Sequence, residues 1–411
     1  MAEVNSDPRR ELALLFSTRI LRMFAYGLLS VILVLYLSRL GFSTSRIGLL
    51  LTLTLLGDTV VSLWMTTTAD RIGRRKMLVA GAVLMLAAGV VFAAVKSFPV
   101  LLLAAIIGVI SPSGNEVGPF LSIEQAALAH VLPSERRTTV FAWYNLAGSL
   151  ATAVGALAGG TAAQWLRRFG LDLLDGYRAV VLGYSVIGLF LAFLFLWLPP
   201  TVELTRNETV SRPLTFLGLH ESQPIILRLA GLFSLDAFAG GFVMQSLIAY
   251  WFHVRFGLDS ATLGGVFFGA NVLAGISALA AGRLAGRFGL LNTMVFTHVP
   301  SNILLILVPL MPTAPLAIIM LLLRFAISQM DVPTRQSYTM AVVHPDERSA
   351  AAGVTGMART IGAGLAPVIA GRFLASASVL SVPFFVSGGL KIVYDLLLYR
   401  SFKAHRPRDL Q

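Results

Sequence analysis

Long apolar runs recur along the whole chain, and they constrain its fold more than any other feature. A helix needs about 20 mostly apolar residues to cross about 30 Å of hydrocarbon. Such runs recur twelve times, and 56% of the 411 residues are hydrophobic whereas 13% are charged. We therefore expect an all-α membrane protein with twelve transmembrane helices. The expected spans lie near 12–38, 46–68, 77–96, 100–132, 138–163, 178–198, 224–253, 260–284, 290–311, 314–343, 349–375 and 380–400.

The basic residues are distributed unevenly over the loops between these spans. With the N-terminus placed in the cytoplasm, the cytoplasmic loops and tails hold 17 Lys and Arg and the opposite loops hold 7. This bias places both termini inside. The net charge of +12 therefore reflects membrane topology, and we expect no nucleic-acid partner. The first span has no small-residue cleavage site after it, which favours a retained helix over a signal peptide.

A polar interruption at 199–222 divides the chain into two halves of six spans, 1–198 and 223–411. The halves resemble each other. A shift of 216 residues places Arg39, Gly41 and Gly48 on equivalent residues of the second half, and "TTTADRIG" (66–73) on "GRLAGRFG" (282–289). Internal repeats of this kind indicate two copies of one structural plan, so we expect two pseudo-symmetric six-helix bundles.

The loop between spans 2 and 3, "DRIGRRK" (70–76), concentrates charge in a short hairpin. Together with the repeat and the central polar loop, it resembles the signature of the major facilitator superfamily. That resemblance implies a transporter fold and a conformational latch between the halves. An alternative is a basic loop that only orients the helices, but an acid has no orienting purpose there. The expected latch residues are Asp70, Arg71, Gly73, Arg74 and Arg75.

A weaker similarity points to the proton-antiporter branch, which effluxes drugs and metabolites. Span 5 contains "GALAGG" (155–160) and span 11 contains "APVIAG" (366–371). Ala156 stands where that branch has proline, and the arginine that many relatives carry early in span 4 is replaced by alanine. Ordinary close packing of helices predicts the same small residues, so this similarity favours antiport only slightly.

Ionisable groups within a span are costly, which makes each of them a candidate functional residue. Asp58, Asp236, Arg22, Arg324 and Arg359 lie about 10–12 residues into their spans, which at 1.5 Å per residue is near the middle of the membrane. Asp58 has no charged residue within four positions on its own helix, so it needs a cation from another helix or a proton. An acid that can take up a proton at this depth is suited to proton coupling.

Span 4 carries the most unusual segment, "GVISPSGNEVGPFLSIEQ" (108–125). Its prolines and glycines flank Asn115 and Glu116 and predict a local break in the helix. Irregular backbone at membrane depth is tolerated where protein or a water-filled cavity covers it, and broken helices mark substrate sites in transporters. We therefore expect the substrate site here.

The family resemblance implies that spans 1, 4, 7 and 10 line a central cavity, and much of the intramembrane charge falls on those spans. Some of it has a structural alternative. Asp331 with Arg335, and Lys391 with Asp395, are spaced to neutralise each other on one helix face. An internal pair such as Arg22 with Glu116 would satisfy both groups without a ligand. The expected substrate-binding and coupling residues are Arg22, Tyr26, Asp58, Asn115, Glu116, Glu124, Asn145, Asp236, Arg324 and Arg359.

These features predict a proton-coupled secondary transporter of a small organic solute that is anionic, zwitterionic or drug-like, working by alternating access. Efflux by antiport is the first expectation; uptake of an organic anion by symport and a non-transporting sensor are alternatives. No phosphate-binding loop, metal-ligand pattern or nucleophile motif occurs, so we expect neither an enzyme nor a bound cofactor, with the proton gradient as energy source. We expect a monomer in a bacterial or archaeal plasma membrane.

Overall fold

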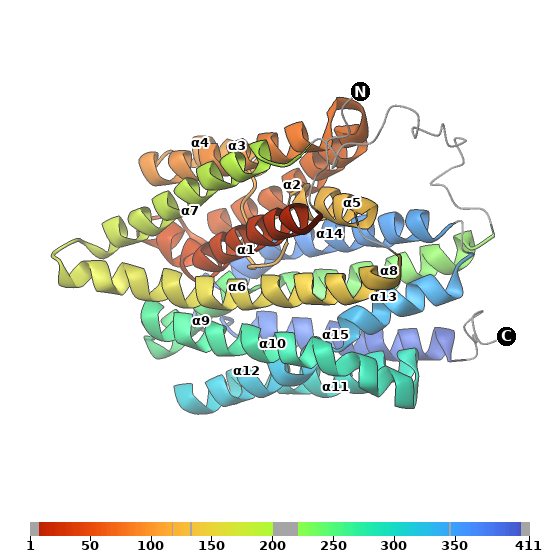
Figure 1. Cartoon of the computed structure of the whole chain (residues 1–411). Helices are drawn as coiled ribbons and strands as arrows, with labels where there is room; N and C mark the ends of the chain where they lie inside the picture. Colours follow the sequence, from red (N-terminus) through yellow and green to blue (C-terminus); the bar gives the residue numbers. More distant parts are fainter. Residues whose placement is uncertain (1–7, 117, 132–133, 200–220, 345–346, 404–411) are drawn as a thin grey trace, which may run out of the picture. The chain divides into compact units, whose positions relative to one another are not determined.

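The computed structural model describes residues 8–116, 118–131, 134–199, 221–344 and 347–403. For some helical residues, Asp70 among them, only the backbone is described. The described chain is helical and contains no β-strand (Figure 1). Its helices are α1 (Pro8–Arg39), α2 (Thr44–Ile72), α3 (Arg74–Ala94), α4 (Phe98–Ile107), α5 (Phe120–Val131), α6 (Ser134–Arg168), α7 (Leu173–Leu196), α8 (Gln223–Gly241), α9 (Gln245–Phe256), α10 (Ser260–Phe288), α11 (Leu290–Leu307), α12 (Ala314–Ser328), α13 (Asp331–Val342), α14 (Arg348–Phe373) and α15 (Val382–Phe402).

Ten stretches of the described chain are long and apolar enough to cross a membrane. They coincide with ten of the twelve expected spans. The fourth span is broken into α4 and α5, and the eleventh is the continuous helix α14, which carries Arg348, Arg359 and Arg372. The all-α membrane fold expected from the sequence is therefore confirmed.

Three of the spans that the resemblance assigns to the cavity are interrupted. Span 4 is not helical over residues 108–116 and 118–119, and Gly114 and Gly118 have positive φ angles of 71° and 81°. Span 7 breaks between α8 and α9, and span 10 breaks between α12 and α13. The break predicted from the prolines and glycines of span 4 is thus confirmed.

The internal repeat has a structural counterpart in the turns. Gly73 precedes α3 with φ 118°, and Gly289, 216 residues later, precedes α11 with φ 85°. Gly41 and Gly257 form a second pair at the same separation, with φ 90° and 70°. A residue with a Cβ is strained at positive φ, so both halves reverse direction at equivalent glycines.

The chain forms two compact units. Unit 1 contains residues 1–41, 57–211 and 259–268, and unit 2 contains 42–56, 212–258 and 269–411. The N-terminal part of α2, up to residue 56, therefore belongs to unit 2, and the N-terminal part of α10, up to residue 268, belongs to unit 1. Each of these parts meets a helix of its unit at a pair of glycines. A Cβ on Gly48 would lie 3.2 Å from the Cα of Gly371, and one on Gly160 would lie 2.9 Å from the Cα of Gly264.

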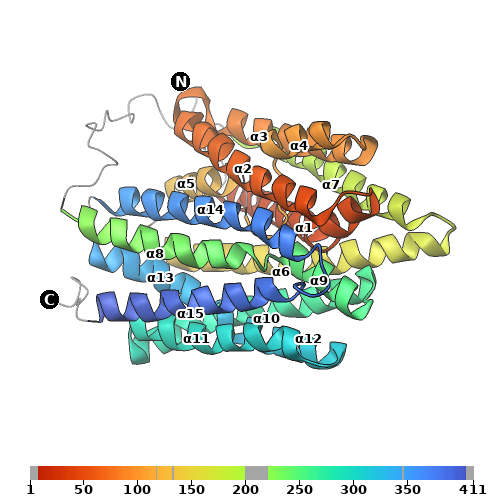
Figure 2. The same ribbon diagram turned by 180° about the vertical axis from the view of Figure 1, so that it is seen from behind.

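Within unit 1, α1 packs against α6 and α7, and α3 packs against α7. Within unit 2, α8 packs against α14 and α15, and α11 packs against α12, α13 and α15 (Figure 2). The packing of α1 on α6 is especially close, because a Cβ on Gly27 would lie 3.0 Å from the Cα of Gly155. Small residues of this kind let the backbones of two membrane helices touch.

Candidate functional site

Each unit buries one cluster of charged side chains. In unit 1 the centre is Arg22 on α1, whose guanidinium holds both carboxylate oxygens of Glu124 on α5 at 2.7 Å. Neither side chain is exposed. Thr18 donates a hydrogen bond of 2.9 Å to Glu124, and the hydroxyl of Tyr144 on α6 donates another. This carboxylate is therefore neutralised and hydrogen-bonded by side chains of two other helices, the bidentate geometry being the strong form of the Arg–carboxylate pair.

Glu116 connects this pair to the irregular segment of span 4. Its carboxylate accepts hydrogen bonds from Arg19 at 2.6 Å and from Arg22 at 2.8 Å. Arg19 also donates to the backbone oxygen of Tyr144 at 3.0 Å and to Asn145 at 3.3 Å. The Glu116 side chain is 15% exposed. The cluster is therefore fully buried at Glu124, its closed end, and partly exposed at Glu116, its open end.

Asp58 on α2 holds the other end of the same irregular segment. Its carboxylate accepts a hydrogen bond from the backbone N–H of Gly118 at 2.7 Å and another from Ser62 at 3.3 Å. No Lys or Arg among the described side chains forms an ion pair with it. The sequence predicts either a cation from another helix or a proton for this carboxyl group. Its described partners are a peptide N–H and a hydroxyl.

In unit 2 the centre is Asp236 on α8, close to the end of that helix. One oxygen, Oδ1, lies 2.5 Å from Lys391 Nζ on α15. The other, Oδ2, lies 3.3 Å from Arg335 on α13 and 3.2 Å from Arg359 on α14. His298 Nε2 on α11 lies 3.8 Å from Oδ1. One buried carboxylate therefore receives cations from three helices.

The two local pairs expected on single helices have different outcomes. The pair of Asp331 and Arg335 is confirmed, at 2.7 Å. The pair of Lys391 and Asp395 is wrong, because Lys391 turns to Asp236 and Asp395 accepts from His298 Nδ1 at 2.8 Å. Sequence spacing predicts partners on one helix, but the partner of Lys391 lies on a different helix.

Arg324 on α12 differs from the other cations of unit 2. It is buried, and its Nε has no hydrogen-bond partner among the described residues. Its guanidinium lies 5.1 Å from the centre of the Phe325 ring and interacts electrostatically with Asp236 and Asp331. Arg359 is the most exposed member, at 33%. A buried guanidinium without a hydrogen-bonded carboxylate is an unusual cost in a protein interior.

The predicted site residues therefore fall into two groups. Arg22, Asn145, Glu116 and Glu124 belong to the cluster of unit 1, and the internal pairing of Arg22 with Glu116, given above as the alternative, is confirmed. Asn115 is exposed beside Glu116, and Tyr26 is fully buried one turn after Arg22. Asp236, Arg324 and Arg359 lie in unit 2.

Sequence reasoning missed His298 and gave Arg19, Arg335 and Lys391 no place in the site. For Arg19 a signal existed, because it precedes Arg22 by three positions, which places both on one face of a helix. For His298 there was none, since its partner Asp395 is 97 residues away in the chain.

The expected latch residues lie at the junction of α2 and α3. Gly73 makes the tight turn that its type predicts, with φ 118°. Arg71 is exposed, Arg74 is buried, and Arg75 donates to the backbone oxygen of Leu198 at 3.4 Å. The side chain of Asp70 lies outside the described residues.

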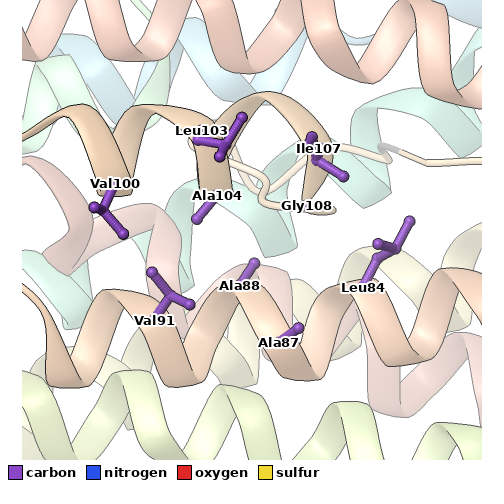
Figure 3. A pocket seen from close by; sticks show the side chains of 9 residues that line it. All are labelled: Leu84, Ala87, Ala88, Val91, Val100, Leu103, Ala104, Ile107 and Gly108. Atoms are coloured by element: carbon purple, nitrogen blue, oxygen red, sulfur yellow. The ribbon is translucent and has the colours of Figure 1, made fainter.

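An apolar groove runs between α3 and α4 in unit 1 (Figure 3). It has a volume of about 240 Å³, and alanines and a glycine form part of its lining. Its lining contains no charged group, so it is separate in chemistry from the charged clusters. The lining residues are Leu84, Ala87, Ala88, Val91, Val100, Leu103, Ala104, Ile107 and Gly108.

Comparisons with known proteins show which class of protein has this fold. Residues 15–367 match the family model of the Major Facilitator Superfamily, and the chain belongs to this family. It is a multi-pass membrane transporter and not an enzyme.

Particular relatives are informative to different degrees. The chain is 32% identical to the "Uncharacterized membrane protein YJR124C" of Saccharomyces cerevisiae, over 95% of this chain and 93% of that one. It is 25% identical to the "Quinolone resistance protein NorA" of Staphylococcus aureus, over 56% of each chain. A crystal structure of the nucleoside transporter NupG superposes with a TM-score of 0.73 at 14% identity, over 96% of this chain and 99% of that one; this similarity concerns the fold.

Proposed function

We propose that the protein is a proton-coupled secondary active transporter of a small organic solute. The six-helix halves 1–198 and 223–411 would expose a central site alternately to the two sides of the membrane, with the proton gradient as energy source and no bound cofactor. Efflux by antiport is the first proposal, supported by the span 5 and span 11 motifs and by the similarity to a protein named for quinolone resistance.

The observation that carries the proposal is the position of the charged clusters. Both contain side chains from helices that are interrupted, and broken membrane helices in transporters expose backbone groups to substrates and coupling ions. Asp58 and Glu116 hold the irregular segment of span 4, and Asp236 lies near the end of α8. Charges that cost several kcal/mol when buried, roughly 2.5 or more each, are retained where they bind or move an ion.

The open end of each cluster is where we place the solute. In unit 1 this end is formed by Glu116 with the exposed Asn115 and Asn145, and in unit 2 by Arg359, with the buried Arg324 near the same carboxylates. Tyr26 supports the Arg22 region as a buried neighbour. Protonation of Asp58, Glu116 or Asp236 would be linked to release of the solute, because the solute and the proton compete for the same charges.

A second candidate function, uptake of an organic anion by proton symport, is favoured by one specific observation. Among the described side chains of the unit 2 cluster, four cations face three carboxylates. An anionic solute would restore neutrality there, and Arg324 has a donor free to bind a carboxylate or phosphate. Guanidinium is suited to such bidentate contacts.

Orientation and mobility of the halves complete the proposal. The loop bias supports a cytoplasmic location for both termini. The proposal also includes a bacterial or archaeal plasma membrane and a monomer as the working unit. The junction carrying Asp70, Arg71, Gly73, Arg74 and Arg75 would then lie on the cytoplasmic side and act as the latch between the halves.

Proteoliposomes with imposed pH gradients of either sign test the proposal. The probes are norfloxacin, a quinolone, and 6-carboxyfluorescein, an organic anion. Antiport predicts accumulation of a probe in the more acidic compartment, because the probe moves against the proton flow. Symport predicts accumulation in the more alkaline compartment. Glu116→Gln and Asp236→Asn should abolish pH-driven accumulation, whereas the surface variant Asp175→Asn should not. Equal accumulation with and without a pH gradient in the wild type would contradict proton coupling.

A further inference from the structure

His298 lies between two carboxylates in unit 2, and the proposed function gives it no role. Its Nδ1 is 2.8 Å from Oδ1 and 3.1 Å from Oδ2 of Asp395, and its Nε2 is 3.8 Å from Oδ1 of Asp236. The three residues come from α11, α15 and α8, and all three are buried. An imidazole in this setting can carry a proton between two anionic partners.

The contact with Asp395 fixes which nitrogen carries hydrogen in the neutral ring. An ionised carboxylate only accepts hydrogen bonds, so Nδ1 must be the donor toward Asp395. Asn302 also donates to this carboxylate, from Nδ2 to Oδ2 at 3.2 Å. The Asp395 carboxylate is thereby oriented by two donors, and it acts as a positioning residue for His298.

The other nitrogen, Nε2, then presents a lone pair toward Asp236. The distance of 3.8 Å exceeds the range of about 2.7–3.2 Å for an N–H···O hydrogen bond, which agrees with two acceptors facing each other. Lys391 Nζ occupies the same oxygen, Oδ1, at 2.5 Å. Asp236 Oδ1 therefore has one cation in contact and a second basic group within reach.

We propose that His298 is a proton-binding site of this transporter and that its protonated ring competes with Lys391 for Oδ1 of Asp236. A hydronium ion gives its proton to Nε2: one O–H bond breaks and leaves water, one N–H bond forms, and the ring gains one positive charge. Nε2 then becomes a donor and can close the gap to Asp236, which frees Lys391 from the oxygen. The proposal rests on proton-coupled transport and assigns the proton to a residue outside the predicted set.

The net charge around His298 determines whether proton binding favours or opposes the binding of an anion. His298 directly faces Asp236 on α8 and Tyr394 and Asp395 on α15. The other described charges lie around Asp236: Arg324 on α12, Asp331 and Arg335 on α13, Arg359 on α14 and Lys391 on α15. With neutral His298 this group has one excess positive charge, and with protonated His298 it has two. An anion arriving at Arg324 and Arg359 would offset the added charge, so proton and anion would bind together, as in the anion symport proposed as the second candidate function.

Histidine NMR on the full-length protein tests the proton site without a known solute. The chain contains six histidines, and ¹⁵N-imidazole labelling distinguishes the two neutral tautomers from the imidazolium. One signal, lost in His298→Gln, should report the Nδ1–H tautomer at high pH and the imidazolium at low pH. The control His253→Gln should remove a different signal and leave this one unchanged, because His253 Nδ1 contacts the backbone oxygen of Leu258 outside the cluster.

Variants of the partners separate a proton site from a structural histidine. In Asp395→Asn the single tautomer should be lost, and in Lys391→Met the imidazolium should already be present at a pH where the wild type is neutral. A His298 signal that stays neutral over the whole pH range in which the protein remains folded would overturn the proposal. So would an imidazolium signal that appears at the same pH in Lys391→Met and the wild type.

Transport measurements distinguish this outcome from failure of the proposed function. If proteoliposomes accumulate a probe in response to a pH gradient but His298→Gln accumulates it equally, the transporter is proton-coupled and His298 is not its proton site. If His298→Gln keeps downhill exchange of the probe and loses pH-driven accumulation, the proposal is supported.

Discussion

The charged clusters of the two units neutralise their buried charges in different ways. In unit 1, two arginines meet two glutamates, and Glu124 is bound bidentately by Arg22 with hydroxyls on its remaining positions. In unit 2, a single carboxylate, Asp236, is shared by Lys391, Arg335 and Arg359. The first arrangement is a closed pair that depends on each partner. The second is redundant and carries surplus positive charge, which makes it the better place for exchanging one partner for another.

The largest effect should follow from breaking the closed pair. Glu124→Ala leaves Arg22 buried without its bidentate partner, and removing one partner of a buried ion pair costs about 3–5 kcal/mol. Thermal and denaturant unfolding of the purified protein in detergent measure this cost. The control Asp175→Asn removes an exposed pair with Arg178, which is worth about 0–1 kcal/mol. Equal losses in the two variants would show that Arg22 is compensated elsewhere.

A smaller loss is expected when the redundant carboxylate loses one cation. Lys391→Met removes the shortest contact of Asp236, a charged hydrogen bond worth about 1.5–3 kcal/mol, while two arginines remain on Oδ2. The same unfolding assay should therefore give a smaller loss than for Glu124→Ala. A loss as large as that of Glu124→Ala would mean that Asp236 is as dependent on one partner as Glu124 is.

The close contact between the backbones of α1 and α6 offers a third test of stability in unit 1. Gly155→Ala on α6 would place a Cβ against the backbone of α1, with the Cα of Gly27 at 3.0 Å. Overpacking of this kind costs about 1–3 kcal/mol. We expect the upper end, because the backbone oxygen of Phe24 lies even closer to this Cβ position and cannot rotate away. Gly183→Ala on α7 is the matched control, because nothing lies within 4 Å of its Cβ position, and it should be neutral or stabilising. Unchanged melting of Gly155→Ala would show that α1 and α6 separate easily.

The smallest effect on folding should come from the surplus cation of unit 2. Arg324→Gln removes a buried guanidinium that has no ion pair among the described side chains, so we expect no loss of unfolding free energy beyond about 0.5 kcal/mol. Binding of an organic anion should nevertheless weaken, which equilibrium dialysis with 6-carboxyfluorescein measures. A large stability loss with unchanged anion binding would place Arg324 among structural residues.

Much of the fold could be predicted because its signals are local. Apolar runs of spanning length located the helices, prolines and glycines located the break in span 4, and the four-residue spacing located the pair of Asp331 and Arg335. These features depend on neighbours along one helix, and the sequence contains them directly.

The arrangement within the clusters depends on contacts between helices, and it could be predicted only in part. Lys391 has Asp395 at the favourable spacing on its own helix, yet it binds Asp236, 155 residues away in the chain. Asp58 was expected to require a cation or a proton, and the structure gives it the N–H of Gly118. The crossing of helices selects such partners, and no spacing rule along the chain encodes it.

The glycine contact between α1 and α6 has a mechanical consequence for the cluster of unit 1. Where two backbones touch, neither helix can twist or slide alone without collision, because no side chain lies between them to yield. Arg19 and Arg22 on α1 and Tyr144 on α6 are therefore attached to backbones that move as one. A shift of α1 would carry α6 with it, so the contact between Arg19 and Tyr144 would be retained.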